Sequence, residues 1–158
     1  MADLRDMTLD ERFRLLTLAQ TARSGSYSPY SKFRVGAALL LSDGTFVTGA
    51  NIENASYGGA ICAERTALVK AVSEGKKRFV ALAVAADIDE PCSPCGICRQ
   101  FIREFCSLDM PILLIPSSHV PSDPSGLTSK AVIETTLGHL LPMSFGPDDL
   151  VKPRPGSL

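Results

Sequence analysis

One segment of the sequence limits the possible folds more than any other. Residues 79–86 form an uninterrupted apolar run. A strand with one face in water would alternate apolar and polar residues, whereas a continuous apolar run is typical of a central strand that is covered on both faces. The sequence therefore predicts a sheet with other elements packed against both of its sides.

Strand-like and helix-forming segments alternate around this run. The turn signal Ser42-Asp43-Gly44 separates two apolar runs, which predicts a β-hairpin. The expected strands are residues 35–41, 45–50, 79–86 and 111–115, and the expected helices are residues 62–74 and 95–105. This order of elements indicates an α/β fold with a mixed sheet, parallel members and crossing helices.

The two ends of the chain add a helix and a tail. Thr8 and Glu11 have the spacing of a capping box, which predicts a helix from residue 9 to about residue 23. Residues 24–31 and 116–129 are expected to be loops, residues 132–141 a short helix, and the last residues, with Pro147, Pro153 and Pro155, a tail. We expect one domain over residues 1–158, with a core at about 8–151 and a tail at 152–158.

Composition excludes several classes of protein. The formal charge of −1 does not provide the basic surface that nucleic-acid binding favours. The first residues are too charged for a signal peptide, and no apolar run reaches transmembrane length. The chain has an odd number of cysteines, five, and three of them lie between residues 92 and 98, which favours metal binding in a reducing compartment over disulfides. We therefore expect a cytoplasmic protein.

Two short segments contain the residues of a metal site. They are Cys62-Ala63-Glu64-Arg65 and Pro94-Cys95-Gly96-Ile97-Cys98. Cys95 and Cys98 are three residues apart on a predicted helix, so both sulfurs can reach one ion. Cys62 opens the other helix, and helix N-termini stabilise thiolates. Three protein ligands leave a fourth position on zinc open, which is typical of a catalytic site.

The two charged residues after Cys62 extend this interpretation. Three thiolates on Zn²⁺ give a formal charge of −1, which the helix ends and a donating Arg65 would offset. Glu64 is not needed as a ligand, and a carboxylate beside the ion could move protons. On an ideal helix, however, Glu64 lies about 200° from Cys62, so the spacing alone leaves its position open.

Other assignments of the cysteines remain possible from the residues alone. Cys92 and Cys95 also fit the pattern P-C-x-x-C, but Pro94 sits better just before a helix than inside the ligand pair. A closed site of Cys62, Cys92, Cys95 and Cys98 would make a structural zinc module with no room for a water. The remaining candidates, Cys92, Cys106, His119 and His139, are expected to be structural or surface residues.

Longer stretches of the chain resemble the small homotetrameric cytidine deaminases. The matching stretches are residues 27–39, 49–57, 61–67, 93–100 and 140–150, within an overall resemblance over about 8–151. The resemblance implies a three-layer α/β/α sandwich, one Zn²⁺ per subunit, and sites shared between the subunits of a homotetramer. It implies hydrolytic deamination of cytidine and 2′-deoxycytidine to the uridines and ammonia, as in pyrimidine salvage, without nucleic-acid or membrane partners.

The resemblance also implies roles for individual residues. Glu64 would carry protons from the attacking water to N3 of cytosine and then to the leaving amino group. The substrate-binding residues would be Phe33, Asn51, Glu53, Tyr57, Ala63 and Phe145, with Asn51 and Glu53 on the ribose and Phe145 donated by a neighbouring subunit. An amide and a carboxylate suit sugar hydroxyls, and aromatic faces suit a flat pyrimidine.

Three other functions share parts of this pattern. A deaminase of modified nucleosides, such as blasticidin-type antibiotics, would use the same zinc core, but the complete Asn51 and Glu53 pair and Phe145 favour the ordinary nucleoside. A polynucleotide-editing deaminase would need a basic channel for the backbone. A structural zinc module would not need Glu64.

Overall fold

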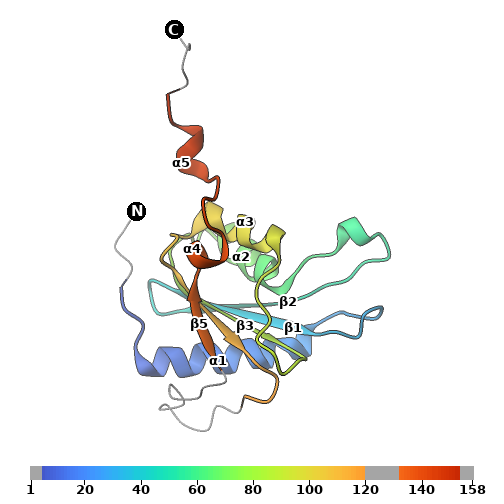
Figure 1. Ribbon diagram of the computed structural model, residues 1–158. Helices are drawn as coiled ribbons and strands as arrows, with labels where there is room; N and C mark the ends of the chain where they lie inside the picture. The colour runs from blue at the N-terminus through green and yellow to red at the C-terminus, as the bar shows by residue number, and fades with distance from the viewer. Residues whose placement is uncertain (1–4, 120–131, 154–158) are drawn as a thin grey trace.

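The computed structural model describes residues 5–119 and 132–153, and its centre is a five-stranded sheet (Figure 1). The strands are β1 (Val35–Leu41), β2 (Phe46–Ala50), β3 (Phe79–Ala86), β4 (Pro111–Ile115) and β5 (Ile133–Thr136), in the order β2-β1-β3-β4-β5. β3 and β4 are parallel, and the other neighbours are antiparallel. The predicted mixed sheet is confirmed, and all residues of β3 are buried.

Helices cover both faces of this sheet. The helix α1 (Leu9–Ala22) packs on one face, and α2 (Ala63–Ser73) and α3 (Gly96–Phe105) pack on the other (Figure 1). Alternate residues of β1 divide between the two cores: Ala38 and Leu40 face α1, whereas Ala37 and Leu39 face α2. The three-layer α/β/α architecture is therefore confirmed.

Two glycines allow the helices to approach the sheet closely. A Cβ atom on Gly36 of β1 would lie 2.2 Å from the carbonyl oxygen of Ala19 in α1. One on Gly49 of β2 would lie 2.4 Å from the backbone nitrogen of Ala67 in α2. No side chain fits at such distances, so each glycine sets the depth at which one helix sits.

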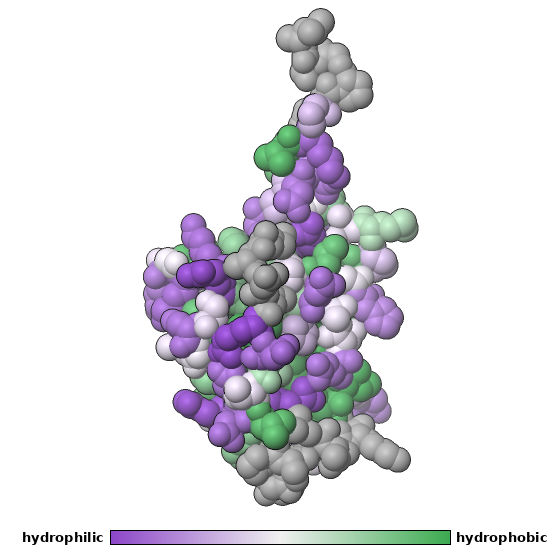
Figure 2. Space-filling view, turned by 90° about the vertical axis from the view of Figure 1, so that its left-hand side faces the viewer, coloured by the Kyte–Doolittle hydropathy of each residue, from purple (hydrophilic) through white to green (hydrophobic). Residues whose placement is uncertain are grey.

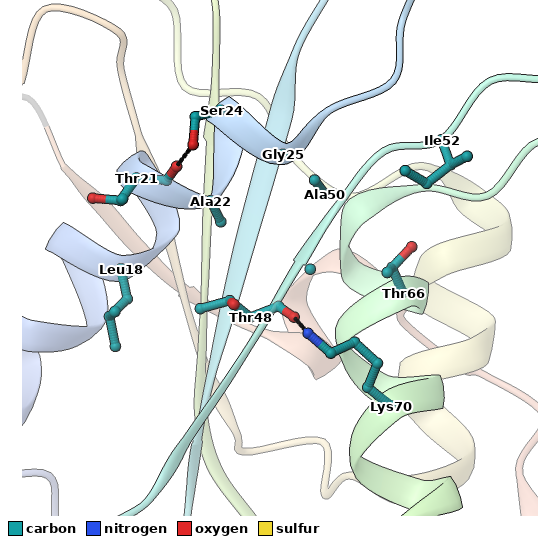
Figure 3. A pocket seen from close by; sticks show the side chains of 11 residues that line it. Leu18, Thr21, Ala22, Ser24, Gly25, Thr48, Ala50, Ile52, Thr66 and Lys70 are labelled. Carbon is teal, nitrogen blue, oxygen red and sulfur yellow. Dashed lines mark hydrogen bonds between the residues drawn. The ribbon is translucent and has the colours of Figure 1, made fainter.

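The edge of the sheet at β2 is open between α1 and α2. Figure 3 shows the groove there, which has a volume of ≈ 420 Å³ and includes Leu18, Thr48 and Lys70 among its lining residues. Lys70 Nζ of α2 donates to the carbonyl oxygen of Thr48 at 2.6 Å. A lysine that binds an edge carbonyl also opposes pairing with another strand.

One sequence prediction is wrong. Residues 132–141 were expected to form a short helix, but they form strand β5 followed by the short helix α4 (Leu137–Leu140). Ile133, Thr135 and Thr136 are β-branched, and β5 pairs antiparallel with β4. Thr136 then caps α4, since its Oγ1 accepts from the backbone N–H of His139.

The remaining short elements lie in the connections and at the C-terminus. The 3₁₀ helix η1 (Arg23–Gly25) begins at the residue where the first helix was expected to end and continues into the loop expected at 24–31. A second 3₁₀ helix, η2 (Tyr57–Gly59), lies between β2 and α2, and α5 (Pro147–Leu150) lies among the last residues, which were expected to form a tail. The C-terminal segment (residues 142–153) projects from the body of the molecule (Figures 1 and 2). Most of the loop predicted at 116–129, from residue 120 onward, lies outside the described residues. Among residues 5–119 and 132–153, none of the helices has the length and apolar character needed to cross a membrane.

Candidate metal centre and active site

Three cysteines converge where α2 and α3 begin. Cys62 is the N-cap of α2, Cys95 is the N-cap of α3, and Cys98 lies in the first turn of α3. Their sulfur atoms all lie within 4.8 Å of one another, and Sγ of Cys62 is 3.9 Å from Sγ of Cys95. Cys98 is buried, Cys62 is half-buried and Cys95 is exposed, so solvent reaches the group at Cys95.

This geometry suits a zinc ion. Zn–S bonds of about 2.3 Å in a tetrahedron place two sulfurs about 3.8 Å apart, close to the separation observed here. Cys92 is half-buried nearby, but it does not belong to the converging group. The arrangement therefore offers three thiolates to one ion and does not favour the closed four-cysteine site.

The local backbone explains why these residues meet. Cys62 and Cys95 both have extended backbone conformations, and neither makes a side-chain cap to its helix. The first N–H groups of a helix have no partners within it, and the N-terminus carries partial positive charge. Both helix starts therefore present positive ends to the sulfurs, as the sequence predicted.

Glu64 lies beside the cysteines and is nearly sealed from water. Only 4 % of its surface is exposed, and burial raises the pKa of its carboxyl group. The carboxyl lies close enough to Cys62, Cys98 and Arg65 for each of them to affect this pKa. The question left open by the sequence is thereby answered: because Cys62 is an extended N-cap and not a helical residue, the ideal-helix angle does not apply.

Arg65 and the neighbouring thiols adjust the charge of the group. Nη2 of Arg65 donates to Sγ of Cys62 at 3.5 Å. The pKa of Cys62 is lowered to about 5, first because the Cys98 thiol donates to it, and then because Arg65 and Cys95 donate to it. One thiolate is therefore already favoured at neutral pH, as a metal ligand requires.

Asn51 and Glu53 bind the segment before β1. Oδ1 of Asn51 accepts from Ser26 Oγ at 2.6 Å and from the backbone N–H of Val35 at 2.8 Å, and its Nδ2 donates to the carbonyl oxygen of Phe33 at 2.9 Å. Both side chains point to the same segment, as the spacing of two residues predicted. Asn51 retains one amide N–H beyond these bonds.

The two carboxylate oxygens of Glu53 accept different numbers of hydrogen bonds. Oε2 accepts from the backbone N–H groups of Tyr30 and Ser31 at 3.0 and 3.2 Å, while Oε1 accepts from the Ser31 hydroxyl. These bonds, led by the hydroxyl of Ser31, lower the pKa of Glu53. Oε1 keeps a free lone pair. Ser31 was not singled out from the sequence, because its contact with Glu53 joins segments far apart in the chain.

A second pocket contains some of the predicted substrate residues and not others. Glu53 and Tyr57 line it, together with Tyr30, Ser31, Asn54 and Ala60, and its volume is ≈ 390 Å³. Tyr57 and Phe145 are largely exposed, at 83 % and 59 % of their surfaces. Phe33 is half-buried, and Ala63 is buried as the first residue of α2.

The two histidines and the other two cysteines have no place in the metal group. His119 is buried and its pKa is lowered by burial, whereas His139 is exposed. Cys106 is buried in the core beneath α3, and burial raises its pKa to about 12. These positions agree with the structural or surface roles expected for them.

Comparisons with known proteins agree with the geometry. Residues 9–113 match the family described as the cytidine and deoxycytidylate deaminase zinc-binding region. The chain belongs to this deaminase family. The matched region includes Cys62, Glu64, Cys95 and Cys98.

Individual deaminases resemble the chain over most of its length. It is 49 % identical to a cytidine deaminase of Sporosarcina psychrophila over 87 % of this chain and 93 % of that one, and 47 % identical to one of Halalkalibacterium halodurans over 89 % and 98 %. A crystal structure of cytidine deaminase from Burkholderia pseudomallei matches with a TM-score of 0.75 and 39 % identity over 88 % of this chain and 100 % of that one.

Proposed function

We propose that the protein is a zinc-dependent hydrolase that deaminates cytidine and 2′-deoxycytidine to uridine and 2′-deoxyuridine. The observation that carries the proposal is the convergence of three thiols beside one buried carboxyl group, Glu64. Family membership fits the same reaction. Its place would be pyrimidine salvage, and its free thiols fit the reducing conditions of the cytoplasm.

The metal would be held by Cys62, Cys95 and Cys98, one ion per subunit. When bound, zinc supplies Lewis acidity and a water acidic enough to act as nucleophile near neutral pH. Arg65 and the two helix ends offset the negative charge of the three thiolates, which would otherwise weaken that acidity.

Glu64 would perform the proton transfers. Burial raises the pKa of the Glu64 carboxyl group, which makes its carboxylate a stronger base towards the attacking water. It would accept one proton of the attacking water and deliver it to N3 of cytosine as the oxygen adds to C4. It would then take the remaining proton from the C4 hydroxyl and pass it to the amino group, so that the C–N bond breaks, ammonia leaves and C4 becomes a carbonyl carbon. Its burial keeps these protons from exchanging with bulk water.

Substrate recognition would use the hydrogen-bonding groups of Asn51 and Glu53 that do not bind the loop before β1. The free lone pair on Oε1 of Glu53 suits the 3′-hydroxyl of the ribose, and the free N–H of Asn51 suits a second sugar oxygen. Phe33 would pack on the substrate, and Ala63 would border the base. The positions of these side chains and the resemblance to the family support the roles proposed for them.

The active site would be completed by a homotetramer. The C-terminal segment projects from the body of the molecule (Figure 2). Two large apolar residues of this segment are exposed, Phe145 and Met143. Large apolar side chains on a projecting segment favour contact with another chain. Phe145 would reach the base in a neighbouring subunit, and the exposed Tyr57 would lie near the same interface.

Substitution of the buried carboxyl group tests the reaction. Glu64→Gln is expected to keep one zinc per chain and to lower kcat for cytidine by at least about 10²–10⁴-fold, because the amide cannot carry a proton. Loss of cytidine absorbance measures turnover, with deoxycytidine and CMP run in parallel. Glu104→Gln is the matched control, since Glu104 is exposed on α3. A fully active Glu64→Gln protein would refute the role of this residue.

The shared site is tested by Phe145→Ala. This variant is expected to raise KM for cytidine, and dilution of the wild-type protein to monomers is expected to abolish activity. Full activity in a strictly monomeric sample would refute the tetramer as the active form.

A further inference from the structure

A buried arginine outside the metal centre contacts the C-terminal segment. Arg103 lies on α3, and 6 % of its surface is exposed. Its Nη2 is 3.6 Å from Oδ2 of Asp148, whereas its Nε and Nη1 atoms are buried without a hydrogen-bond partner among the described residues. Burying a guanidinium group costs desolvation free energy that an apolar residue would not cost. Because two of its three nitrogen atoms lack a hydrogen-bond partner, hydrogen bonding does not explain why an arginine is buried here.

The backbone of Gly146 rests on this arginine. A Cβ atom on Gly146 would lie 2.5 Å from Cζ, 2.6 Å from Nη2 and 2.8 Å from Nε of Arg103. These nearly equal distances place it over the guanidinium group. Gly146 has φ −146° and ψ 179°, an extended conformation open to any residue. A methyl group at residue 146 would therefore require the buried guanidinium group of Arg103 to shift, whereas the backbone conformation does not require a glycine.

The contact fixes the point where the segment leaves the body of the molecule. Nε2 of Gln100, also on α3, donates to the carbonyl oxygen of Phe145 at 3.0 Å. Gln100 and Arg103 are one turn apart on the helix, so they hold the consecutive residues Phe145 and Gly146. The same helix carries Cys98, so one rigid element orders both the metal ligand and the base of the segment.

We propose that Arg103 is a positioning residue whose guanidinium group seats Gly146 and so fixes the direction in which Phe145 projects. The inference rests on the proposed function in one respect: Phe145 is taken to contact the base in a neighbouring subunit. Loss of the seat would then weaken substrate binding and leave the chemical step unchanged, because it alters neither Glu64 nor the thiolates.

A double-mutant cycle tests the seat. Gly146→Ala and Arg103→Ala are each expected to raise KM for cytidine about tenfold, the equivalent of one lost interaction, with kcat nearly unchanged. In the Arg103→Ala background, adding Gly146→Ala is expected to have almost no further effect, because the group that the methyl would strike is gone. An equal penalty for Gly146→Ala in both backgrounds would overturn the proposal.

A second readout does not depend on turnover. Both single variants are expected to speed amide hydrogen exchange in residues 144–149, with zinc content and exchange in β3 unchanged. Glu104→Gln, the next residue on the helix, is expected to match the wild type in both assays. If the wild type does not turn over cytidine, the proposed function fails, and hydrogen exchange alone tests the role of Arg103. Exchange in residues 144–149 that is unchanged in both single variants would refute that role.

Discussion

The helices on the two faces of the sheet begin in different ways. The start of α1 is closed by its own side chains: Oγ1 of Thr8 accepts from the N–H of Glu11, and the Glu11 carboxylate accepts from the N–H of Thr8. The starts of α2 and α3 carry Cys62 and Cys95 at the equivalent position, and neither side chain caps its helix.

The difference shows how one structural position can serve stability or chemistry. In the capping box of α1, two backbone N–H groups at the helix start, those of Thr8 and Glu11, are bound within the chain. An uncapped start leaves N–H groups and positive potential available to anions. At the starts of α2 and α3 these anions are the cysteine thiolates. The α1 face is therefore complete without a ligand, whereas the α2–α3 face depends on what the cysteines hold.

The largest effect is expected from removing the metal. A ligand at about a thousand times its Kd stabilises the folded state by about 4 kcal/mol, so chelation is expected to lower the free energy of unfolding by at least this amount and to abolish activity. Hydrogen exchange should accelerate at the starts of α2 and α3 and stay slow in α1. Uniform acceleration in all three helices would contradict the division between the faces.

A pair of cysteine variants separates the loss of a metal ligand from the loss of a nearby thiol that is not a ligand. Cys98→Ala is expected to lose zinc and activity, because two thiolates no longer make the three-ligand site. Cys92→Ala is the matched control, since Cys92 is half-buried nearby but outside the converging group. Metal analysis after gel filtration gives the answer, and loss of zinc in Cys92→Ala would revive the four-cysteine site.

The next largest effect is expected at the two close-approach glycines. Gly36→Ala and Gly49→Ala should each lower the free energy of unfolding by about 1–3 kcal/mol, as overpacking does. Only Gly49→Ala should also lower kcat, because the added methyl would push on Ala63 and Ala67 of α2, on either side of Glu64. Gly25→Ala is the control, since its Cβ would make only an ordinary 3.7 Å contact with Ala50.

Denaturant unfolding and steady-state kinetics on the three glycine variants separate the two faces. If Gly36→Ala lowers kcat as much as Gly49→Ala does, the face of α1 is coupled to the active site, and the contrast between the faces does not hold.

The parts of the fold that the sequence predicted correctly are those specified by local patterns of apolar and capping residues. The run at 79–86 was located correctly because burial on both faces leaves a continuous apolar signature, and the helix starting at Leu9 because its cap is local. Residues 132–141 were misjudged because their strand is specified by pairing with β4, a partner distant in the chain. Local propensity alone does not decide such a segment.

The candidate site divides in the same way. The cysteines were found because ligand spacing within a helix turn is local, and their convergence across two helices is now seen in the structure. The seat formed by Arg103 and Gly146 could not be predicted, since it depends on where the chain returns after β5. The position of Glu64 required the backbone conformation of Cys62, which spacing does not reveal.

A smaller effect is expected at the capped start. Thr8→Ala removes the acceptor for the N–H of Glu11, and loss of such a cap costs about 0.5–2 kcal/mol. Activity of the folded protein should not change, because α1 lies on the face away from the metal centre. Urea unfolding measures the loss, with Thr45→Ala as a surface threonine control. A fall in kcat without loss of stability would contradict the separation of roles.

The smallest effect concerns the pH dependence of the same cap. The Glu11 carboxylate accepts from Arg5 Nη2 at 2.6 Å and Nη1 at 2.8 Å, and this pair lowers the pKa of Glu11 to about 2 from its ordinary 4.5. Because the folded pKa is depressed, the stabilisation is complete above about pH 4.5 and is lost as the pH falls towards 2. The pair is only partly buried, so solvent screens it and its contribution is about 1 kcal/mol.

Comparison with Glu11→Gln isolates this contribution from other acid-sensitive groups. Protonation of the thiols releases zinc in both proteins, so that loss cancels in the difference between their free energies of unfolding. The wild type should be the more stable protein at pH 6, and its advantage should shrink steadily between pH 4.5 and 2. An advantage that stays constant over this range would show that the capping hydrogen bonds, and not the charge of Glu11, stabilise the start of α1.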